Sequence, residues 1–359
     1  MTRRRLVHVF ATFGAGGPQV RAVQLLAHLG PGYEHVVMAM DGCTEAAAML
    51  PATVTVQFVT PPPRRGFVAN VRVQRRWLRE QRPELVLTYN WGAIETAAAA
   101  RWLGLPLVHH EDGFLPDEVQ RRLRRRSWLR TFVLRNTPVI VPSLVLRSIA
   151  AHDWRLRESL VHHLPNGVDL QRFRLASPSP RELVVGTVGG LRAEKDHSTL
   201  LQAVSKLASR PRVCIVGGGV LADPLRIEAR GLGLSDVVEF VGPVVDIAPS
   251  YAGFSVFVLS SRTEQMPIAM LEAMACGLPV VATDVGDVRA ILPPEAAAFL
   301  VPPGDPTALA AALERLLADA SLRTQLGAAN RRRVEERYEA TTCLDRFVRV
   351  YEQALAARR

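Results

Sequence analysis

The chain has 359 residues and 48% of them are hydrophobic, which suits two domains of ordinary size and excludes a disordered chain. The formal net charge is +10, and residues 1–165 carry this whole excess, with 22 Lys and Arg against 12 Asp and Glu. No apolar run reaches the roughly 18–20 residues of a membrane span. The four cysteines are far apart and show neither metal-binding nor disulfide spacing, which favours a reduced cytoplasm.

The first half of the chain alternates short apolar runs with helical patterns. A basic start and a short apolar run are compatible with a signal peptide, but the run ends in glycines rather than a cleavage site, so a first strand is expected. The expected strands are Leu6–Ala11, His35–Met40, Val54–Val59, Leu85–Tyr89, Pro106–His110 and Val139–Pro142, and the expected helices are Gln19–Leu29, Val68–Gln81 and Ala93–Leu103. This alternation predicts an α/β fold with a doubly wound parallel sheet.

A stretch rich in Pro, Ser and Asn then predicts a linker over residues 166–181, between a first domain at 1–165 and a second at 182–338. A last helix at 339–357 is expected to pack back on the first domain. The second half repeats the scheme. Its expected strands are Leu183–Val188, Arg212–Val216, Val237–Val241, Ser255–Leu259 and Pro279–Thr283, and its helices are His197–Leu207, Pro224–Leu232, Ile268–Ala275, Thr307–Leu317 and Ser321–Arg337.

The most informative segment is SRTEQMPIAMLEAMACGLPVVATDVG at Ser261–Gly286. Pro267 stands where a helix would begin, and the helix formers that follow are stopped by Gly277 and a second proline. Glu264 therefore falls in the loop before a helix and Glu272 about one turn inside it. A helix N-terminus suits a phosphate, and ionised carboxylates accept hydrogen bonds from sugar hydroxyls.

This segment resembles the nucleotide-sugar motif of retaining glycosyltransferases of family 4, bacterial enzymes among them, which have the GT-B fold. The resemblance implies two Rossmann-like domains facing a cleft. It implies that Glu264 binds hydroxyls of the donor sugar, beside the backbone of Met266, Pro267 and Ile268, and that Glu272 holds the ribose. Gln265 and Met266 stand where the family has Gly and Phe, so the sugar contacts are expected to differ in detail.

The stretch GTVGGLRAEKD, after the first strand of the second half, resembles the family segment G-R-L-x-x-E-K, which holds the donor phosphates. Gly189 and Gly190 lie in this loop, and Lys195 matches the lysine. The arginine position is occupied by Gly190, and we expect Arg192 to supply the guanidinium instead. A guanidinium binds phosphate through two hydrogen bonds and stays charged, so its loss would weaken the site.

Other glycine-containing loops complete the expected donor site. Gly16 and Gly17 follow the first strand and match the glycine pair that the family places against the donor diphosphate and the acceptor; a tight packing turn is the alternative. Their pattern is not G-x-G-x-x-G, which disfavours a dinucleotide site. Gly242 and Val244 match a family segment that places its backbone against the nucleobase of the donor. Because backbone contacts leave no side-chain pattern, the sequence does not identify the base.

His109 and His110 end a strand of the first half, and family members carry a histidine nearby that touches the transferred sugar. Neighbouring strand residues point to opposite faces, so only one of them can do so, and we favour His110. A metal site at these histidines is disfavoured, because the sequence offers no second cluster of metal ligands to support it. The chain contains no D-x-D triplet, so we expect no metal and no cofactor, with Lys195, Arg192 and helix N-termini neutralising the leaving diphosphate.

The basic segment 118–136 interleaves seven arginines with Leu, Trp, Phe and Val. Such a helix can lie on an anionic membrane, and a solvated arginine face over an ordinary core is the equal alternative. Nucleic acid is disfavoured because no recognised binding motif accompanies the charge.

Together with these features, the resemblance to family 4 implies a retaining, metal-independent glycosyltransferase. It would move a sugar from a nucleotide diphosphate sugar to a hydroxyl of a glycan or lipid-linked acceptor, in bacterial envelope or polysaccharide synthesis. The expected location is the cytoplasm, with contact at the inner face of the cell membrane as an extension. The alternatives are a GT-B epimerase or phosphorylase, and a non-catalytic nucleotide-sugar-binding scaffold.

Overall fold

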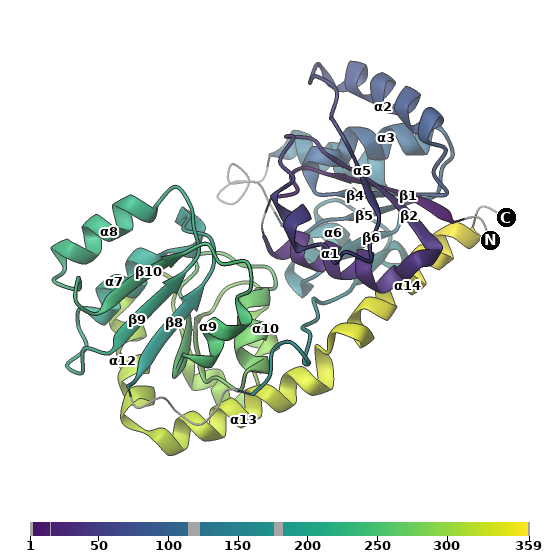
Figure 1. The fold of residues 1–359 in the computed structure, drawn as a ribbon. Helices are drawn as coiled ribbons and strands as arrows, with labels where there is room; N and C mark the ends of the chain where they lie inside the picture. The colour runs from purple at the N-terminus through teal and green to yellow at the C-terminus, as the bar shows by residue number, and fades with distance from the viewer. Residues whose placement is uncertain (1–2, 15, 114–122, 176–181, 358–359) are drawn as a thin grey trace. The chain divides into compact units, whose positions relative to one another are not determined.

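The computed structural model describes residues 3–14, 16–113, 123–175 and 182–357. It divides into two units (Figure 1). Unit 1 comprises the described parts of residues 1–166 and 341–359, and unit 2 comprises those of 167–340. Each unit is a parallel sheet with helices packed on it. The last six residues of the expected linker, 176–181, and the first residues of the basic segment, 118–122, lie outside the described residues.

Unit 1 holds a seven-stranded parallel sheet in the order β3-β2-β1-β4-β5-β6-β7. The strands are β1 (Arg4–Phe10), β2 (Tyr33–Ala39), β3 (Val56–Val59), β4 (Leu85–Tyr89), β5 (Leu107–His110), β6 (Val139–Val141) and β7 (Val161–His163). The central strands are apolar runs buried on both faces, which parallel strands covered by helices require.

The helices of unit 1 cover both faces of this sheet. They are α1 (Gly17–Leu29), α2 (Phe67–Gln81), α3 (Ile94–Trp102), α5 (Arg124–Leu134), α6 (Leu144–His152) and α14 (Ala340–Ala356), with 3-10 turns η1 (Gly30–Gly32), η2 (Glu45–Met49), η3 (Trp91–Ala93) and η4 (Glu158–Leu160). The described part of the basic segment is thus the helix α5.

Unit 2 holds a six-stranded parallel sheet in the order β10-β9-β8-β11-β12-β13. The strands are β8 (Val184–Val188), β9 (Arg212–Val216), β10 (Val238–Gly242), β11 (Val256–Leu259), β12 (Val280–Thr283) and β13 (Leu300–Val301). The helices are α7 (His197–Val204), α8 (Ala222–Gly231), α9 (Ala248–Ala252), α10 (Ile268–Ala275), α11 (Val288–Ile291), α12 (Pro306–Ala318) and α13 (Ala320–Arg337), with 3-10 turns η5 (Ala193–Lys195) and η6 (Pro294–Phe299).

Both sheets have the doubly wound strand order. The chain adds strands on one side of the first strand, and then returns to add the remaining strands on its other side. In unit 2 the reversal falls between β8 and β11, and in unit 1 between β1 and β4. Ligands of such sheets bind at the carboxyl ends of the strands at this switch point. The topology therefore marks the loops after β8 and β11 as the place to look for a site.

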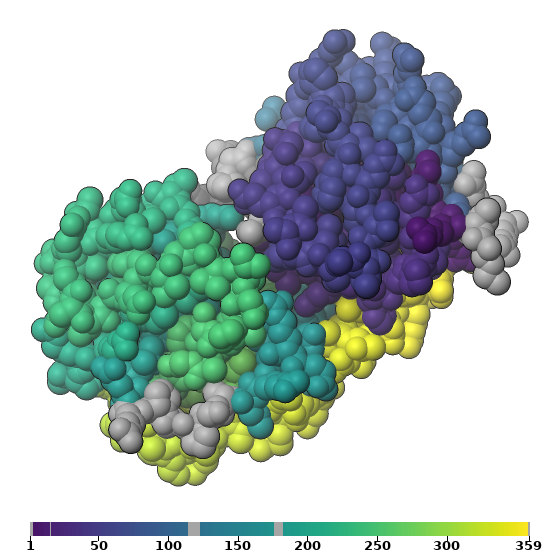
Figure 2. Space-filling model, viewed as in Figure 1, coloured from purple at the N-terminus to yellow at the C-terminus, as the bar shows by residue number. Residues whose placement is uncertain are grey.

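The C-terminal helix α14 belongs to the core of unit 1. Phe347 and Tyr351 are buried on it, and Asp345 accepts a hydrogen bond of 2.7 Å from His28 of α1. The yellow C-terminal residues lie against the purple N-terminal ones in the space-filling view (Figure 2). Within the described part of the chain, no helix has both the length and the apolar content needed to cross a bilayer.

Candidate active site

The loops at the carboxyl edge of the unit 2 sheet are tied to one another by backbone hydrogen bonds. After β8, the amide of Gly189 donates to the carbonyl of Val216 at the end of β9, at 2.9 Å. After β11, the amide of Arg262 donates to the carbonyl of Glu194, at 2.8 Å. The segments that the sequence singled out separately, 186–196 and 261–286, therefore meet at the switch point.

Two glycines permit this close approach of the loops. Gly217 has φ +145, and a β-carbon there would collide with the carbonyl of Gly189. Gly286 has φ +55, and a β-carbon there would collide with the carbonyl of Glu264. These glycines are needed for contact between loops and for positive φ, so they fix the backbone around the site.

Lys195 and Glu264 form the centre of the site. The Nζ atom of Lys195 donates to Oε1 of Glu264 at 2.5 Å, and the hydroxyl of Ser261 donates to the same oxygen at 2.7 Å. The Lys195 side chain is 29% exposed and that of Glu264 10%. The pair is thus partly open to solvent, and an ammonium with three donors can hold a phosphate oxygen as well as the carboxylate.

Arg192 lies against the place that a side chain at residue 190 would occupy. A β-carbon built on Gly190 would be 3.1 Å from Nε of Arg192 and 3.5 Å from Cζ. The Arg192 side chain is 58% exposed, with its guanidinium 4.0 Å from Glu194. The glycine at the family's arginine position therefore leaves room for a guanidinium that comes from two residues later.

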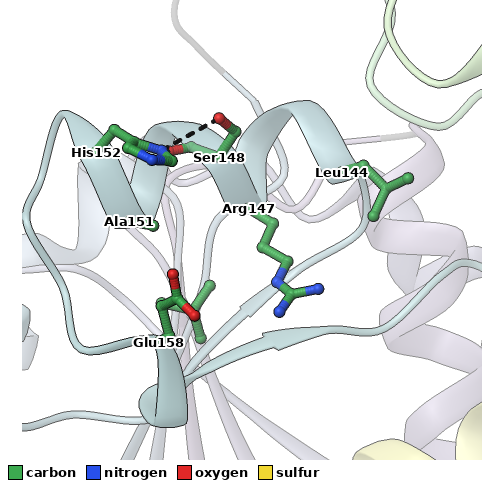
Figure 3. A pocket seen from close by; sticks show the side chains of 7 residues that line it. Leu144, Arg147, Ser148, Ala151, His152 and Glu158 are labelled. Carbon is green, nitrogen blue, oxygen red and sulfur yellow. Dashed lines mark hydrogen bonds between the residues drawn. The ribbon is translucent and has the colours of Figure 1, made fainter.

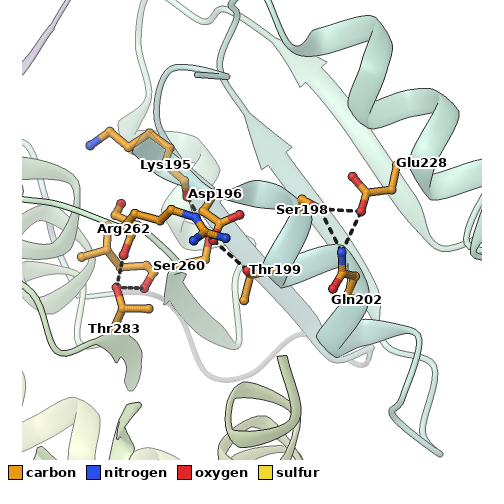
Figure 4. A network of polar contacts seen from close by, with 11 residues as sticks. Lys195, Asp196, Ser198, Thr199, Gln202, Glu228, Ser260, Arg262 and Thr283 are labelled. Atoms are coloured by element: carbon orange, nitrogen blue, oxygen red, sulfur yellow. Dashed lines mark hydrogen bonds and ion pairs between the residues drawn. The ribbon is translucent and has the colours of Figure 1, made fainter. Parts of the chain in front are cut away.

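A second ion pair supports the loop after β8 (Figure 4). Nε of Arg262 lies 2.9 Å from Oδ2 of the buried Asp196, which also accepts a hydrogen bond of 2.7 Å from Thr199. Asp196 has φ +45, a left-handed conformation at the start of α7. These contacts hold the backbone that carries Lys195, whose ammonium points away from the Asp196–Arg262 pair.

Glu272 lies on α10 and is only 4% exposed. The hydroxyl of Tyr251 donates to its Oε2 at 2.7 Å. Burial raises the pKa of Glu272 to about 7, while the hydrogen bond from Tyr251 and the charge of Arg172 act in the opposite direction. This carboxyl group can therefore be neutral or charged near neutral pH.

The N-terminus of α10 carries no side-chain cap, because the N-cap residue is Pro267. Met266, Pro267 and Ile268 are buried at this end of the helix. The first amides of a helix have no partner within the helix, so they are available to an anion next to Lys195 and Glu264. At the end of β10, Gly242 has φ +84 and Val244 is 36% exposed, on the same edge of the sheet.

In unit 1 the predicted glycines form the start of α1. Gly16 is the N-cap and Gly17 the first helical residue, directly after β1. A β-carbon on Gly16 would come within 2.9 Å of Gln19, whose side chain donates to the carbonyl of Thr12. The structure thus places Gly16 and Gly17 at the N-terminus of α1, which has no side-chain cap.

The sugar contact expected for His110 stays a prediction, and the structure shows how its ring is held. Both His109 and His110 are fully buried. The ring of His110 is hydrogen-bonded to Tyr351 of α14 at 2.9 Å and stacks on Tyr89 at 4.5 Å. Burial and the nearby Arg21 hold the pKa of His110 well below its usual range. The His110 ring is therefore packed between the sheet of unit 1 and α14.

The sequence reasoning missed a buried ion pair at the same edge of the unit 1 sheet. Arg21 of α1 binds both carboxylate oxygens of Asp112, at 2.6 and 2.9 Å, and its Nη1 also donates to Asn166 at 3.1 Å. The Arg21 and Asp112 side chains are at most 4% exposed. The sequence contained one signal for this ion pair. Arg21 lies among apolar residues of the predicted helix Gln19–Leu29, and a buried charge of this kind needs a partner.

A surface pocket of about 250 Å³ lies elsewhere on unit 1 (Figure 3). It is lined by Leu144, Arg147, Ser148, Ala151, His152, Glu158 and Val161. None of the residues predicted for the site is among them. The described residues contain no group of three or more His, Cys, Asp and Glu side chains placed to hold a metal ion.

Comparison with known proteins decides the family. Residues 15–172 match the sequence model of Glycosyltransferase Family 4, and residues 182–319 match that of Glycosyl transferases group 1. A D-inositol 3-phosphate glycosyltransferase of Kineococcus radiotolerans is 33% identical, over 90% of this chain and 87% of the relative. The chain belongs to glycosyltransferase family 4.

Two further proteins extend this family 4 assignment. An MMP alpha-(1->4)-mannosyltransferase of Mycolicibacterium hassiacum is 30% identical, over 72% of this chain and 62% of the relative. The crystal structure of Anabaena HepE in complex with UDP and glucose superposes with a TM-score of 0.85 over 98% of this chain and 100% of the other, at 18% identity. That likeness confirms the GT-B fold.

The family 4 protein is accordingly an enzyme, a glycosyltransferase that takes its sugar from a nucleotide sugar. Membership of this family disfavours the non-catalytic scaffold alternative. The geometry brings Lys195, Glu264, Arg192, Gly189 and Gly190 together and places α10 beside them.

Proposed function

We propose that this glycosyltransferase transfers its sugar with retention of anomeric configuration, from a nucleoside diphosphate sugar to an acceptor hydroxyl. The observation that carries the proposal is the partly exposed Lys195–Glu264 pair next to the uncapped N-terminus of α10. Cations and helix amides suit the diphosphate, and the carboxylate suits the sugar hydroxyls. Glu272, one turn along α10, is assigned to the ribose.

The chemistry assigned to these residues is electrostatic. As the bond between sugar and diphosphate breaks, negative charge grows on the leaving phosphate oxygen. Lys195 and Arg192 are positioned to offset that charge, and fixed cations stabilise a transition state strongly where water is scarce. The acceptor attacks from the face that the diphosphate leaves, and its proton passes to the leaving phosphate oxygen. No metal ion is needed in this scheme, and we propose that activity survives chelation.

For the acceptor, we propose a glycan or lipid-linked hydroxyl of the bacterial envelope, reached with α5 at an anionic membrane surface. The support is the exposed aromatic face of that helix. Trp128 is 68% exposed and Phe132 60%, and their rings stack at 6.0 Å. Arg124 and Arg125 on the same helix are exposed. Apolar side chains beside arginines suit the interface of an anionic bilayer.

The proposed donor site is tested by replacing Glu264 with Gln. The amide keeps the size of the side chain but loses the charge that pairs with Lys195, so kcat/KM should fall on the order of 100-fold. Turnover would be measured with a panel of nucleotide sugars and acceptors, with and without EDTA. NMR of the product would report the anomeric configuration.

The matched control is Glu295→Gln, an exposed glutamate of the same unit, which should retain full activity. Full turnover by Glu264→Gln, or a product of inverted configuration, would overturn the proposal. A donor-only conversion, or turnover that requires inorganic phosphate, would instead indicate the epimerase or phosphorylase alternative.

A further inference from the structure

The hydroxyl of Tyr251 lies between two acceptors on α10. It is 2.7 Å from Oε2 of Glu272 and 3.2 Å from the carbonyl oxygen of Ala269. A phenol has one proton, so it donates to one of these acceptors at a time. The tyrosine is fully buried, and which acceptor it serves must depend on the charge of Glu272.

Two complete arrangements follow from this geometry. When Glu272 is ionised, Tyr251 donates to its Oε2. When Glu272 is protonated, its own O–H donates to the Tyr251 oxygen, and Tyr251 turns its proton to Ala269. The Tyr251 hydroxyl and Oε2 of Glu272 keep a hydrogen-bond partner in both arrangements, so neither arrangement breaks the contact between the two side chains.

The Tyr251 ring is held in place by aromatic neighbours. Phe173 and Phe254 meet it edge-on at 5.7 and 5.8 Å, and Phe257 lies at 6.0 Å. This packing leaves the hydroxyl proton as the part free to move. Among the described residues, Oε1 of Glu272 accepts no hydrogen bond, so the second carboxylate oxygen is left for a ligand.

We propose that Tyr251 is a positioning residue that aims the Glu272 carboxylate at the ribose of the donor and couples donor binding to release of one proton. The inference rests on the proposed donor site. A ribose hydroxyl donates to an ionised carboxylate, so binding selects the arrangement in which Tyr251 donates to Oε2. The proton that leaves Glu272 passes to solvent.

The charges around the trio give the direction of the pH dependence. Burial raises the pKa of Glu272 to about 7, and Tyr251 and Arg172 oppose that rise. Cys276 also faces Tyr251, and Arg331 of α13 binds the carbonyls of Phe173 and Ala275. Because the neutral form prevails below this pKa, donor affinity should be weak at acidic pH and rise as the pH passes through about 7.

The test is calorimetric titration of the full chain with a nucleotide sugar between pH 5.5 and 9 (about the range in which Glu272 changes charge). A nucleotide sugar is preferable to a nucleoside diphosphate, because a terminal phosphate itself titrates with a pKa near 6. Buffers of different ionisation enthalpy report protons released. Tyr251→Phe removes the hydroxyl and keeps the ring, and Tyr33→Phe in unit 1 is the matched control.

For the wild type and Tyr33→Phe, affinity for the nucleotide sugar should rise as the pH increases through about 7. Below this pH, binding should release up to one proton. In Tyr251→Phe the midpoint should rise by about one pH unit, since a hydrogen bond to a charged group is lost, and the dissociation constant at pH 7 should increase about fivefold. Glu272→Gln should abolish the pH step. Thermal unfolding of each variant separates misfolding from this effect.

Wild-type binding without a pH step, or an unchanged midpoint in a folded Tyr251→Phe, would overturn this inference and leave the proposed function standing. Failure of every nucleotide sugar to bind at any pH would count against the donor site itself, and the inference would fall with it.

Discussion

At the scale of single residues, Gly190 and Arg192 show how a charge can be kept when a motif changes. The Arg192 guanidinium packs against the place of a side chain at residue 190, so the two positions cannot both carry a large side chain without movement. Gly190 does not have a positive φ, so an L-residue fits its backbone. We therefore expect the arginine to be exchangeable between the two positions.

This exchange gives a rescue experiment. Arg192→Ala should lower kcat/KM about 10- to 100-fold, because a charged hydrogen bond to phosphate is worth about 1.5–3 kcal/mol. The double variant Gly190→Arg with Arg192→Ala should recover much of this loss. Steady-state kinetics at low donor concentration would measure both. Arg226→Ala, an exposed arginine of the same unit, should behave as wild type. Wild-type kinetics in Arg192→Ala would remove this arginine from the site.

The residues that were predicted correctly as neighbours lie in contiguous motifs. Lys195 and Glu264 each stand in a loop next to a strand end, and strand order alone brings such loops together. Tyr251, Asp112 and the burial of His110 could not be predicted. They depend on contacts between segments far apart in the sequence, such as that of His110 with Tyr351, and no local pattern encodes these.

At the scale of elements, the longer helices and most strands of both sheets were predicted. The expected helix Val68–Gln81 is α2 at Phe67–Gln81, and the expected strand Leu85–Tyr89 is β4. The helix α6 and the strands β7 and β13 were not predicted. β7 and β13 have three and two residues, too few for a periodic signal, and both are defined by pairing with a neighbouring strand.

The helix α14 shows how one element completes a domain from a distant part of the sequence. Phe347 is fully buried, with the guanidinium of Arg21 5.3 Å from its ring and the His110 ring stacked at 6.0 Å. Without this helix, the buried charge of Arg21 and the histidine would face water. We therefore expect α14 to be integral to the stability of unit 1.

Phe347→Ala tests that expectation. Removing a fully buried phenylalanine should lower the free energy of unfolding by about 3–5 kcal/mol. Urea unfolding followed by far-UV circular dichroism would measure the change. Arg346→Ala, an exposed neighbour on the same helix, should have an effect within about 0.5 kcal/mol. Equal stability of the two variants would mean that α14 is an appendage rather than part of the core.

At the scale of the whole molecule, the charge distribution matters more than its sum. The excess of +10 lies entirely in residues 1–165, whereas residues 166–359 carry equal numbers of both signs. An uneven field of this kind attracts anionic surfaces, and salt screens it over about 10 Å at 0.1 M. Because exposed aromatic and basic side chains share α5, unit 1 should bind anionic membranes through this helix.

Vesicle co-sedimentation would measure that binding. The wild type should bind vesicles of anionic lipid and be released by salt, and it should bind zwitterionic vesicles weakly. Each arginine near the surface contributes about 1 kcal/mol, or about fivefold in partitioning, so Arg124→Glu with Arg125→Glu should reduce binding by well over tenfold. Trp128→Ala with Phe132→Ala should weaken it even at low salt, because the apolar part of the contact is not screened.

Ile227→Ala, which changes an exposed apolar residue of unit 2, is the control and should bind as the wild type does. Unchanged binding in both double variants would place the membrane contact elsewhere, and α5 would then be the solvated arginine face that the sequence left open.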